Sequence, residues 1–352
     1  MAGFLEQDWT RIHRDTTFRP VTPLLALCSA GYGVGVRLRL WGFRSGLFRR
    51  HRAPGPVISV GNVTVGGTGK TPFVIMLAEW CRQTGYRPAV LSRGYGGRHG
   101  DKVMEVSDGQ GIKADAGACG DEPWLLANAL DGVPVVVSKK RVLAARYAGE
   151  RFGCDLFILD DGFQHMELKR DVDVVLVDAA HPFGNGRLLP WGPLREPVRR
   201  IRRADACVIT RCGKETAAEK THRLLAGMFP SKPVFRSDHV PYGLCFPRTG
   251  KVHAPGFLKG RRVAAFAGIA DPDAFRESLE GLGADVVCFR GFRDHHWYRA
   301  GETRDLLREM KARGGEYLLT TEKDWPRVSR FVMDISCAGY LSIRLEMVSG
   351  RD

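Results

Sequence analysis

The stretch PVISVGNVTVGGTGKT, residues 56–71, decides the fold of this chain. The apolar run at 56–60 predicts a β-strand, and the glycine-rich segment behind it ends in Gly69-Lys70-Thr71 where a helix begins. In such a turn the backbone N–H groups converge on phosphate oxygens, the lysine reaches the β and γ phosphates, and the hydroxyl ligates Mg²⁺. The stretch therefore predicts a site for a nucleoside triphosphate. The loop residues expected at the phosphates are Gly66, Gly67, Thr68, Gly69, Lys70 and Thr71.

One position departs from the usual phosphate-loop pattern. A glycine is expected where this chain has Thr64, and the Gly66-Gly67 pair offers a compensation. The alternative is a glycine-rich turn that carries Lys-Thr by chance. The preceding strand and Pro72, which suits the first turn of a helix, both favour the phosphate loop.

Composition narrows the class of protein and of partner. With 352 residues, of which 44% are apolar, the chain is long enough for two globular domains. Nine scattered cysteines without a C-x-x-C pair predict reduced thiols in the cytosol, neither a disulfide framework nor a zinc site. A net charge of +14 calls for an anionic partner, which could be nucleic acid, an acidic membrane or a phosphorylated substrate. The cations concentrate in the first fifty residues and at 195–203, without the alternating aromatics of a base-stacking surface.

The N-terminal region contains an uncharged run at 20–36 followed by apolar residues among arginines. The run is too short and too rich in glycine for a spanning helix, and the charges that follow it do not fit a signal peptide. Two interpretations stay open. Residues 1–55 form an amphipathic segment that lies on an anionic membrane, or the helix packs on the protein's own core.

Apolar runs alternate with helical stretches along the rest of the chain. The runs at 56–60, 88–91, 133–137, 156–159, 172–177, 206–210 and 234–235 predict a parallel sheet covered by helices. After Ser237 the composition turns rich in proline and glycine, which predicts a linker hairpin at 239–260 between a domain at 56–238 and a smaller α/β domain at 261–352. The second domain should have strands near 262–266, 285–289, 317–320 and 339–343, and helices near 273–282 and 304–313.

A second chemical motif is DLFILDDGFQH at 155–165, an apolar strand that ends in two carboxylates. The carboxylate behind a strand next to a phosphate loop commonly holds Mg²⁺, so Asp160 is the metal candidate. Asp161 is a second metal contact or a helix cap, and a purely structural turn is the alternative.

Three further segments carry weaker signals. Asp121, in Gly-Asp-Glu-Pro before a helix at 124–130, has the pattern of an N-cap. His295 and His296 are adjacent and therefore poor chelators, which leaves a base or hydrogen-bonding role or a plain surface loop. In the segment 92–97, Arg93 could bind a phosphate group, and Tyr95 could pack against a ring of the ligand.

The order of these motifs resembles a known family. Residues 61–71, 92–96, 120–123, 160–165, 194–197, 294–295 and 320–324 follow one another as in tetraacyldisaccharide 4'-kinases of lipid A biosynthesis, and the resemblance covers nearly the whole length. It implies a P-loop NTPase-like α/β/α sandwich joined by a two-stranded linker to a smaller α/β domain. It also implies transfer of the ATP γ-phosphate to the 4'-hydroxyl of a lipid-linked glucosamine disaccharide 1-phosphate, with Mg²⁺, peripherally at the cytoplasmic face of a Gram-negative inner membrane.

The resemblance also implies roles for individual residues. Asp121 becomes a general base paired with His295, and the two domains would close over the linker. Lys70 would neutralise phosphates, and Thr71 with Asp160 would position Mg²⁺. The other site residues are Asp161 and His165 near the phosphates, Glu122 as a metal or network partner, Arg195 as a phosphate-binding cation, and Tyr95 in the cleft wall.

Two rival functions remain from the residues alone. A phosphate-loop GTPase or ATPase that drives assembly is one, because Lys323-Asp324 faintly resembles a guanine-reading element, although the two residues are adjacent. A nucleic-acid-binding ATPase that uses the net charge is the other. The kinase interpretation expects a membrane glycolipid and an anionic membrane surface as partners, no nucleic acid and no obligate protein partner.

Overall fold

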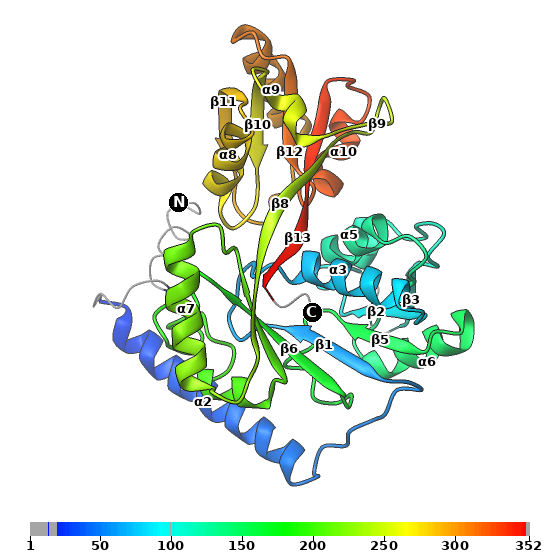
Figure 1. Ribbon diagram of the computed structural model, residues 1–352, viewed down its shortest axis with the longest axis vertical. Helices are drawn as coiled ribbons and strands as arrows, with labels where there is room; N and C mark the ends of the chain where they lie inside the picture. Colours follow the sequence, from blue (N-terminus) through cyan, green and yellow to red (C-terminus); the bar gives the residue numbers. More distant parts are fainter. Residues whose placement is uncertain (1–12, 14–19, 99, 101, 350–352) are drawn as a thin grey trace. The chain divides into compact units, whose positions relative to one another are not determined.

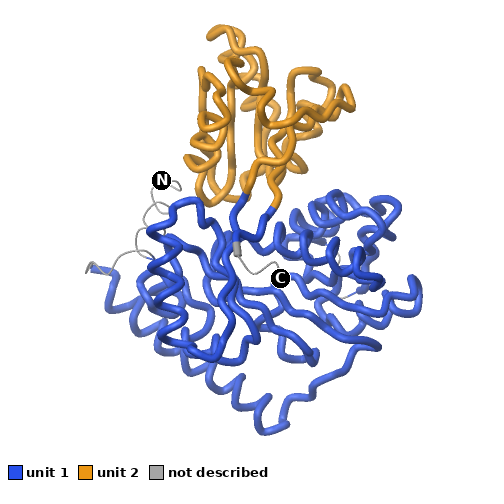
Figure 2. Tube along the Cα trace, viewed as in Figure 1, with its two compact units in different colours: residues 1–239, 345–352 blue, residues 240–344 orange. Residues whose placement is uncertain are grey.

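The computed structural model describes residue 13, residues 20–98, residue 100 and residues 102–349. The chain divides into two compact units (Figure 2). Unit 1 contains residues 1–239 and 345–352, and unit 2 contains residues 240–344. The chain enters unit 2 in strand β8 (Val234–Phe246) and returns in β13 (Ala338–Ser349).

Unit 1 is built on a mostly parallel sheet with the strand order β8-β7-β6-β1-β5-β2-β4-β3 (Figure 1). The central strand β1 pairs in parallel with β5, Val57 opposite Phe157, and with β6, Ile58 opposite Val172. At the edge of the sheet, β3 runs antiparallel to β4. The bounds are β1 (Val57–Gly61), β2 (Pro88–Ser92), β3 (Met104–Ser107), β4 (Val135–Val137), β5 (Leu156–Leu159), β6 (Val172–Asp178) and β7 (Ala206–Thr210).

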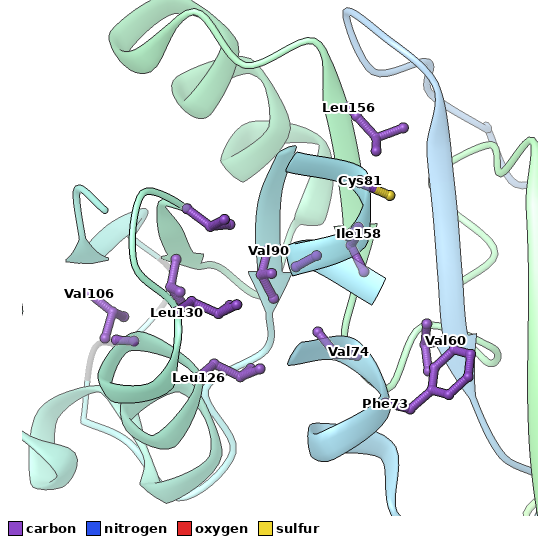
Figure 3. Packing of buried hydrophobic residues seen from close by; sticks show 14 of the residues in the cluster. Val60, Phe73, Val74, Cys81, Val90, Val106, Leu126, Leu130, Leu156 and Ile158 are labelled. Atoms are coloured by element: carbon purple, nitrogen blue, oxygen red, sulfur yellow. The ribbon is translucent and has the colours of Figure 1, made fainter. Parts of the chain in front are cut away.

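Helices cover both faces of this sheet, as the unbroken apolar strands require. Val60, Val90 and Ile158 pack on the face covered by α3 and α5, where Phe73 lies beside Val60 (Figure 3). Phe157 and Leu159 point to the other face, against α6. The helices are α2 (Thr22–Arg44), α3 (Lys70–Gln83), α4 (Ala116–Cys119), α5 (Asp121–Ala129), α6 (Arg141–Phe152), the 3₁₀ turn η1 (Val198–Arg203) and α7 (Glu215–Met228).

The strands of unit 2 follow the order β11-β10-β12-β13-β8, and β9 is attached to β8 as a hairpin. The pairs β10–β11, β10–β12 and β12–β13 are parallel. Apolar clusters around Phe266 and Leu319 fill the two faces of these strands. The elements are β9 (Lys251–His253), η2 (Pro255–Leu258), β10 (Arg262–Ala267), α8 (Pro272–Gly281), β11 (Asp285–Gly291), α9 (Ala300–Ala312), β12 (Tyr317–Thr321) and α10 (Trp325–Val332).

The expected strands are present, but several bounds were wrong. The run at 234–235 is the start of a thirteen-residue strand that continues through Pro241 and Gly243. The last strand is also longer than expected, and its final residues belong to unit 1. Both strands carry mixed polar and apolar side chains, so they lack the continuous apolar runs from which the other strands were predicted. The assignment of 239–260 as an inter-domain linker stays a prediction.

Candidate nucleotide and phosphoryl-transfer site

The phosphate loop joins the end of β1 at Gly61 to the start of α3 at Lys70. Gly69 is the N-cap of α3 in the left-handed conformation, with φ of 76°. A Cβ atom at this position would lie 2.6 Å from Nε2 of His239, so both backbone conformation and space require glycine. The predicted strand, turn and helix therefore occur at the predicted positions.

Lys70 is held at the base of this loop and is only 8% exposed. Its Nζ lies 3.4 Å from Oδ1 of Asn62, to which it donates, and 3.6 Å from Oδ1 of Asp161. Asn62 also donates to the hydroxyl of Thr68 at 2.9 Å, and Thr210 donates to the Thr68 carbonyl at 3.0 Å. Asn62 thus aligns the lysine and the loop, a role that the sequence motif did not reveal.

Asp160 follows β5 directly and is 1% exposed. Ser92, at the end of the neighbouring β2, donates to Oδ2 at 3.2 Å, while the buried Oδ1 has no hydrogen-bond partner. Burial raises the pKa of Asp160, the carboxylates of Glu122 and Asp161 raise it further, and Lys70 opposes them. A buried carboxylate oxygen without a donor fits a divalent cation.

The donor set also limits what kind of metal site this can be. Within the described part of the chain, no group of three or more His, Cys, Asp or Glu side chains could hold a metal ion by itself. A cation at Asp160 would therefore depend on the Thr71 hydroxyl, water and nucleotide phosphates for its other ligands. Magnesium commonly binds in this way.

Asp161 lies between two cations. Its backbone is left-handed, with φ of 50°, and Nη1 of Arg195 contacts its two carboxylate oxygens at 2.9 and 2.7 Å. Burial would raise the pKa of Asp161, yet Lys70 and Arg195 outweigh it and hold the pKa below its usual range. Asp161 therefore stays charged and couples Arg195 to Lys70.

His165 and Arg141 form a buried part of the same region. Burial, followed by the charge of Arg141, lowers the pKa of His165 to about 3, so the imidazole is neutral. Arg141 is the first residue of α6, is 2% exposed, and has an Nε atom without a hydrogen-bond partner. Burial, followed by the charge of Arg93, lowers the pKa of Arg141 to about 10. Arg141 lies in no recognised sequence motif, and the charged residues that act on it, Arg93, Asp160 and Asp161, come from other segments of the chain.

The helix that follows Gly120 begins one turn earlier than expected. Gly120, with φ of 97°, is the N-cap of α5, and Asp121 is its first helical residue, so the assignment of Asp121 as an N-cap was wrong. Glu122 is close enough to raise the pKa of Asp160. Tyr95 is 85% exposed in the turn after β2, and its place in a cleft wall stays a prediction.

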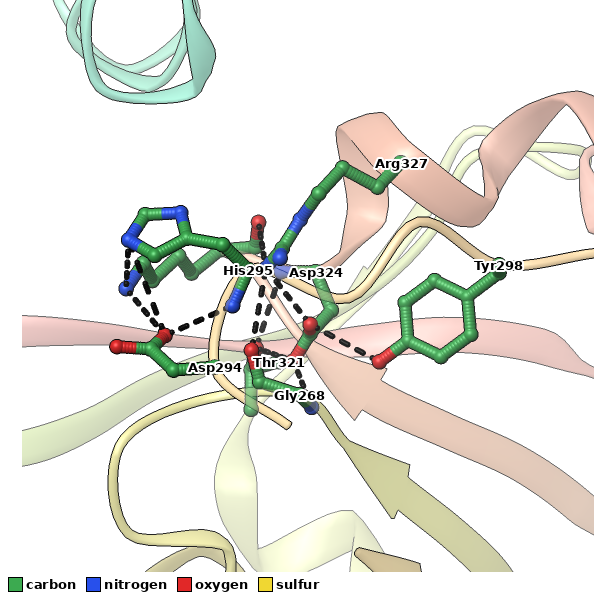
Figure 4. Close-up of polar contacts among 8 residues, drawn as sticks. Gly268, Asp294, His295, Tyr298, Thr321, Asp324 and Arg327 are labelled. Atoms are coloured by element: carbon green, nitrogen blue, oxygen red, sulfur yellow. Dashed lines mark hydrogen bonds and ion pairs between the residues drawn. The ribbon is translucent and has the colours of Figure 1, made fainter. Parts of the chain in front are cut away.

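In unit 2, His295 is fixed by its surroundings (Figure 4). Its backbone is left-handed with φ of 58°, and its backbone N–H donates to both the Gly268 carbonyl at 3.1 Å and Oδ1 of Asp294 at 3.0 Å. Nζ of Lys323 lies 3.4 Å from Nε2 of His295 and 3.0 Å from Oδ1 of Asp294. His296, by contrast, stacks on Phe292 and pairs with Glu302, so the two histidines do not form a chelating pair.

Asp324 explains the segment that resembled a guanine-reading element. The carboxylate is fully buried and accepts hydrogen bonds from the Tyr298 hydroxyl at 3.0 Å, the Gly268 N–H at 3.0 Å and the Thr321 hydroxyl at 2.6 Å. Arg327 adds a fourth donor at 2.8 Å. With these four donors in place, Asp324 anchors unit 2 and cannot present its carboxylate to a base (Figure 4).

Comparison with known proteins agrees with this site. A family model described as "Tetraacyldisaccharide-1-P 4'-kinase" matches residues 21–351. The chain belongs to this kinase family. It is 44% identical over 336 residues to the tetraacyldisaccharide 4'-kinase of Syntrophus aciditrophicus, covering 93% of this chain and 90% of that one. It is 45% identical over 307 residues to the enzyme of the same name from Geobacter metallireducens, covering 87% and 88%.

A solved structure supports the same assignment. The chain is similar to LpxK from Aquifex aeolicus, crystallised in complex with ATP, with a TM-score of 0.75, 33% identity, and coverage of 93% of this chain and 95% of that one. The predicted α/β class with a phosphate-loop kinase fold is therefore confirmed. The resemblance inferred from the order of the motifs is confirmed as well.

Proposed function

We propose that this kinase uses ATP to phosphorylate the 4'-hydroxyl of a tetraacylated glucosamine disaccharide 1-phosphate, a lipid A precursor. The observation that carries the proposal is the buried Lys70 in the phosphate loop, which lies beside the strand-end carboxylates Asp160 and Asp161. Membership of the family supports the acceptor, and the similarity to an ATP-bound relative supports the donor.

Different residues of the chain can bind the phosphates and the metal ion. Lys70 would contact the β and γ oxygens once nucleotide replaces its contact to Asp161, and Arg195 would keep Asp161 neutralised meanwhile. Thr71 and Asp160 would hold Mg²⁺. The ion would neutralise the negative charge of the phosphoryl group during transfer. The neutral, buried His165 would not repel that cation.

The acceptor hydroxyl needs a group that takes its proton. We assign this role to Asp121, with His295 orienting it, so that the hydroxyl oxygen forms the new bond to the γ phosphorus while the bond to ADP breaks. Asp121 belongs to unit 1 and His295 to unit 2, so the proposed pair would bring residues of both units to the substrates. The left-handed backbone and the contacts of His295 to Asp294 and Lys323 support a fixed orientation for the imidazole.

Helix α2 fits a partner in the membrane. One face packs on unit 1 through Leu40 and Phe43, and Ser29 donates to the Leu188 carbonyl at 2.9 Å. The opposite face carries large apolar side chains that recur every three to seven residues, which places them in one row along the helix. Their exposed fractions run from 50% to 72%, and they are Leu24, Leu27, Val34, Leu38 and Trp41.

The packed face of α2 agrees with the interpretation that the helix packs on the protein's own core, and the exposed row supports the interpretation that it lies on a membrane. Among the described helices, none is long and apolar enough to cross a bilayer. We propose that α2 lies in the interface of an anionic membrane, with its exposed row in the acyl boundary and with Arg37, Arg39 and Arg44 at the headgroups. On this proposal the kinase acts as a peripheral protein at the cytoplasmic face of the inner membrane.

A vesicle-binding assay tests the membrane proposal. The double variant Leu38→Glu/Trp41→Glu should bind vesicles of anionic phospholipid at least about tenfold more weakly, since burying one large apolar side chain contributes roughly 1.5–3 kcal/mol. Trp80→Glu is the matched control, because Trp80 is 59% exposed on α3. Equal binding of wild type and double variant would contradict the role of α2.

A product assay tests the activity. Wild-type protein with Mg²⁺, γ-labelled ATP and the disaccharide 1-phosphate lipid in mixed micelles should yield a labelled lipid. GTP-dependent hydrolysis that needs no lipid would favour the nucleotide-switch alternative, and hydrolysis stimulated by oligonucleotides in a salt-sensitive way would favour the nucleic-acid alternative.

A further inference from the structure

A second basic site lies at the edge of the unit 1 sheet that faces away from the phosphate loop. The phosphate loop follows the carboxyl end of β1, and Asp160 follows that of β5. The second site is a cavity of about 1040 Å³ at the amino ends of β1 and β6. It is formed by the C-terminal turn of α2, residues 50–57, residues 166–173 and η1.

The cavity is lined by eight arginines and one lysine but only two carboxylates, Asp171 and Asp173. Both carboxylates already have partners. Asp173 accepts from Nε and Nη2 of Arg170 at 3.2 and 2.8 Å, and Asp171 accepts from the Val57 N–H at 2.8 Å. A third carboxylate, Glu196, neutralises Arg203 at 2.6 and 2.9 Å.

The remaining cations of the cavity have no carboxylate partner in the part of the chain that the structure describes. Arg200 is the clearest case, because its Nε atom is shielded from solvent and makes no hydrogen bond. Burial, followed by the charges of Arg44 and Arg199, lowers the pKa of Arg200, and Glu196, which is already bound to Arg203, opposes this only in part. These unpaired cations are Arg44, Arg50, Arg52, Lys169, Arg199, Arg200 and Arg202.

Crowded guanidinium groups that lack a counter-charge destabilise a fold unless an anion joins them. Planar guanidinium groups match phosphate oxygens in particular, because each can donate two parallel hydrogen bonds. The cavity also has an apolar part, made by Leu40, Met166 and Leu168, that suits the glycerol or chain portion of an organic phosphate. Its volume lies just above the usual upper limit of about 1,000 Å³ for small-molecule sites.

We propose that this basic cavity binds the phosphate group of an anionic ligand, at a site separate from the nucleotide and the acceptor. Two sources share this chemistry, the headgroup of an anionic phospholipid and a free phosphate compound. Arg44 is the last residue of α2, one turn beyond the exposed Trp41, so a headgroup in the cavity would be close to the end of the apolar row. The proposal depends on unit 1 alone and does not require the kinase activity.

The test uses the full chain and three exposed arginines of the cavity. Arg52→Gln/Arg199→Gln/Arg202→Gln removes three charges without touching a buried group. The matched control, Arg82→Gln/Lys220→Gln/Arg223→Gln, removes three exposed charges from α3 and α7 of the same unit. Arg200→Gln is a second cavity variant, and thermal unfolding reports whether each variant is folded.

Two probes distinguish the sources. One is vesicles of phosphatidylcholine containing about one-fifth phosphatidylglycerol. The other is inorganic phosphate or glycerol phosphate in solution, followed by calorimetry. For a lipid headgroup, the cavity variants should bind vesicles at least about tenfold more weakly than the control variant, with little binding of the soluble compounds by any protein. For a free phosphate compound, wild type and control should bind it saturably, and the cavity variants should lose that binding.

Equal losses in the cavity and control variants would show that the net charge acts diffusely and would overturn the proposal. Unchanged binding of both probes by the cavity variants would overturn it as well.

Discussion

Nζ of Lys70 lies 3.6 Å from Oδ1 of Asp161, whose two oxygens are also contacted by Arg195. The carboxylate is thus shared by the phosphate-loop lysine and a second cation. Because Arg195 neutralises Asp161, Lys70 is available to the nucleotide. Phosphoryl-transfer sites depend on such charges being in place before the reaction begins.

Arg195→Gln should therefore raise the KM for ATP about tenfold, equivalent to about 1.4 kcal/mol, because Asp161 would then hold Lys70 alone. Steady-state kinetics at saturating lipid acceptor measures the change. The double variant Asp161→Asn/Arg195→Gln completes a double-mutant cycle, and the two single effects should not add. Additive effects would show that the two residues act independently.

Gly69→Ala should weaken ATP binding at least about tenfold, because a left-handed alanine costs roughly 1–2 kcal/mol and its Cβ would meet His239. Calorimetric titration with ATP measures the affinity. Gly227→Ala in α7 is the control, since no atom lies within 4 Å of the added Cβ, and it should bind ATP as wild type does. Undiminished ATP affinity in Gly69→Ala would contradict the described loop conformation.

Asp324→Asn should destabilise unit 2 by roughly 3–5 kcal/mol, because it removes the carboxylate charge that pairs with the fully buried Arg327. Urea unfolding followed by tryptophan fluorescence measures the change, since Trp325 lies next to the site in sequence. Asp305→Asn on α9 is the control, because Asp305 is exposed, and it should change stability by less than about 0.5 kcal/mol. A stable Asp324→Asn variant would show that the network does not anchor the unit.

Glu322 predicts a pH dependence of stability. Burial raises the pKa of Glu322 to about 7, against opposition from the Ile343 N–H and Arg344. The folded state therefore binds more protons than the unfolded state between about pH 4.5 and 7, so this group's contribution to the free energy of unfolding falls as pH rises through that window. Glu322→Gln should be stabilised relative to wild type by an amount that grows from pH 5 to pH 8. A constant difference across that range would contradict the raised pKa.

The strands of the unit 1 sheet could be predicted because each is a short apolar run that helices cover on both faces. The phosphate loop, Asp160 and Asp161 could be predicted for a related reason, since parallel strands bring their carboxyl ends to one edge. The lengths of β8 and β13 could not, because neither strand is a continuous apolar run and β8 also includes Pro241 and Gly243.

Arg141, Asn62 and Asp324 show what the sequence leaves out. Arg141 has no motif around it, and only the start of α6 brings it to the buried side of the site. Asn62 stood inside a recognised motif, but its contacts to Lys70 and Thr68 depend on how the loop folds back. Asp324 resembles part of a nucleotide-reading element in sequence, but in the structure its carboxylate is buried and its oxygens accept hydrogen bonds from neighbouring residues. In each case tertiary packing, rather than local pattern, decides the role.

The most direct test of the central claim is transfer of labelled γ-phosphate from ATP to the disaccharide 1-phosphate lipid, comparing wild type with Asp121→Ala and Lys70→Ala. The account predicts a labelled lipid with wild type and reductions of at least about a hundredfold in both variants, while both remain folded. A folded wild-type protein that hydrolyses ATP but labels no lipid would contradict the account.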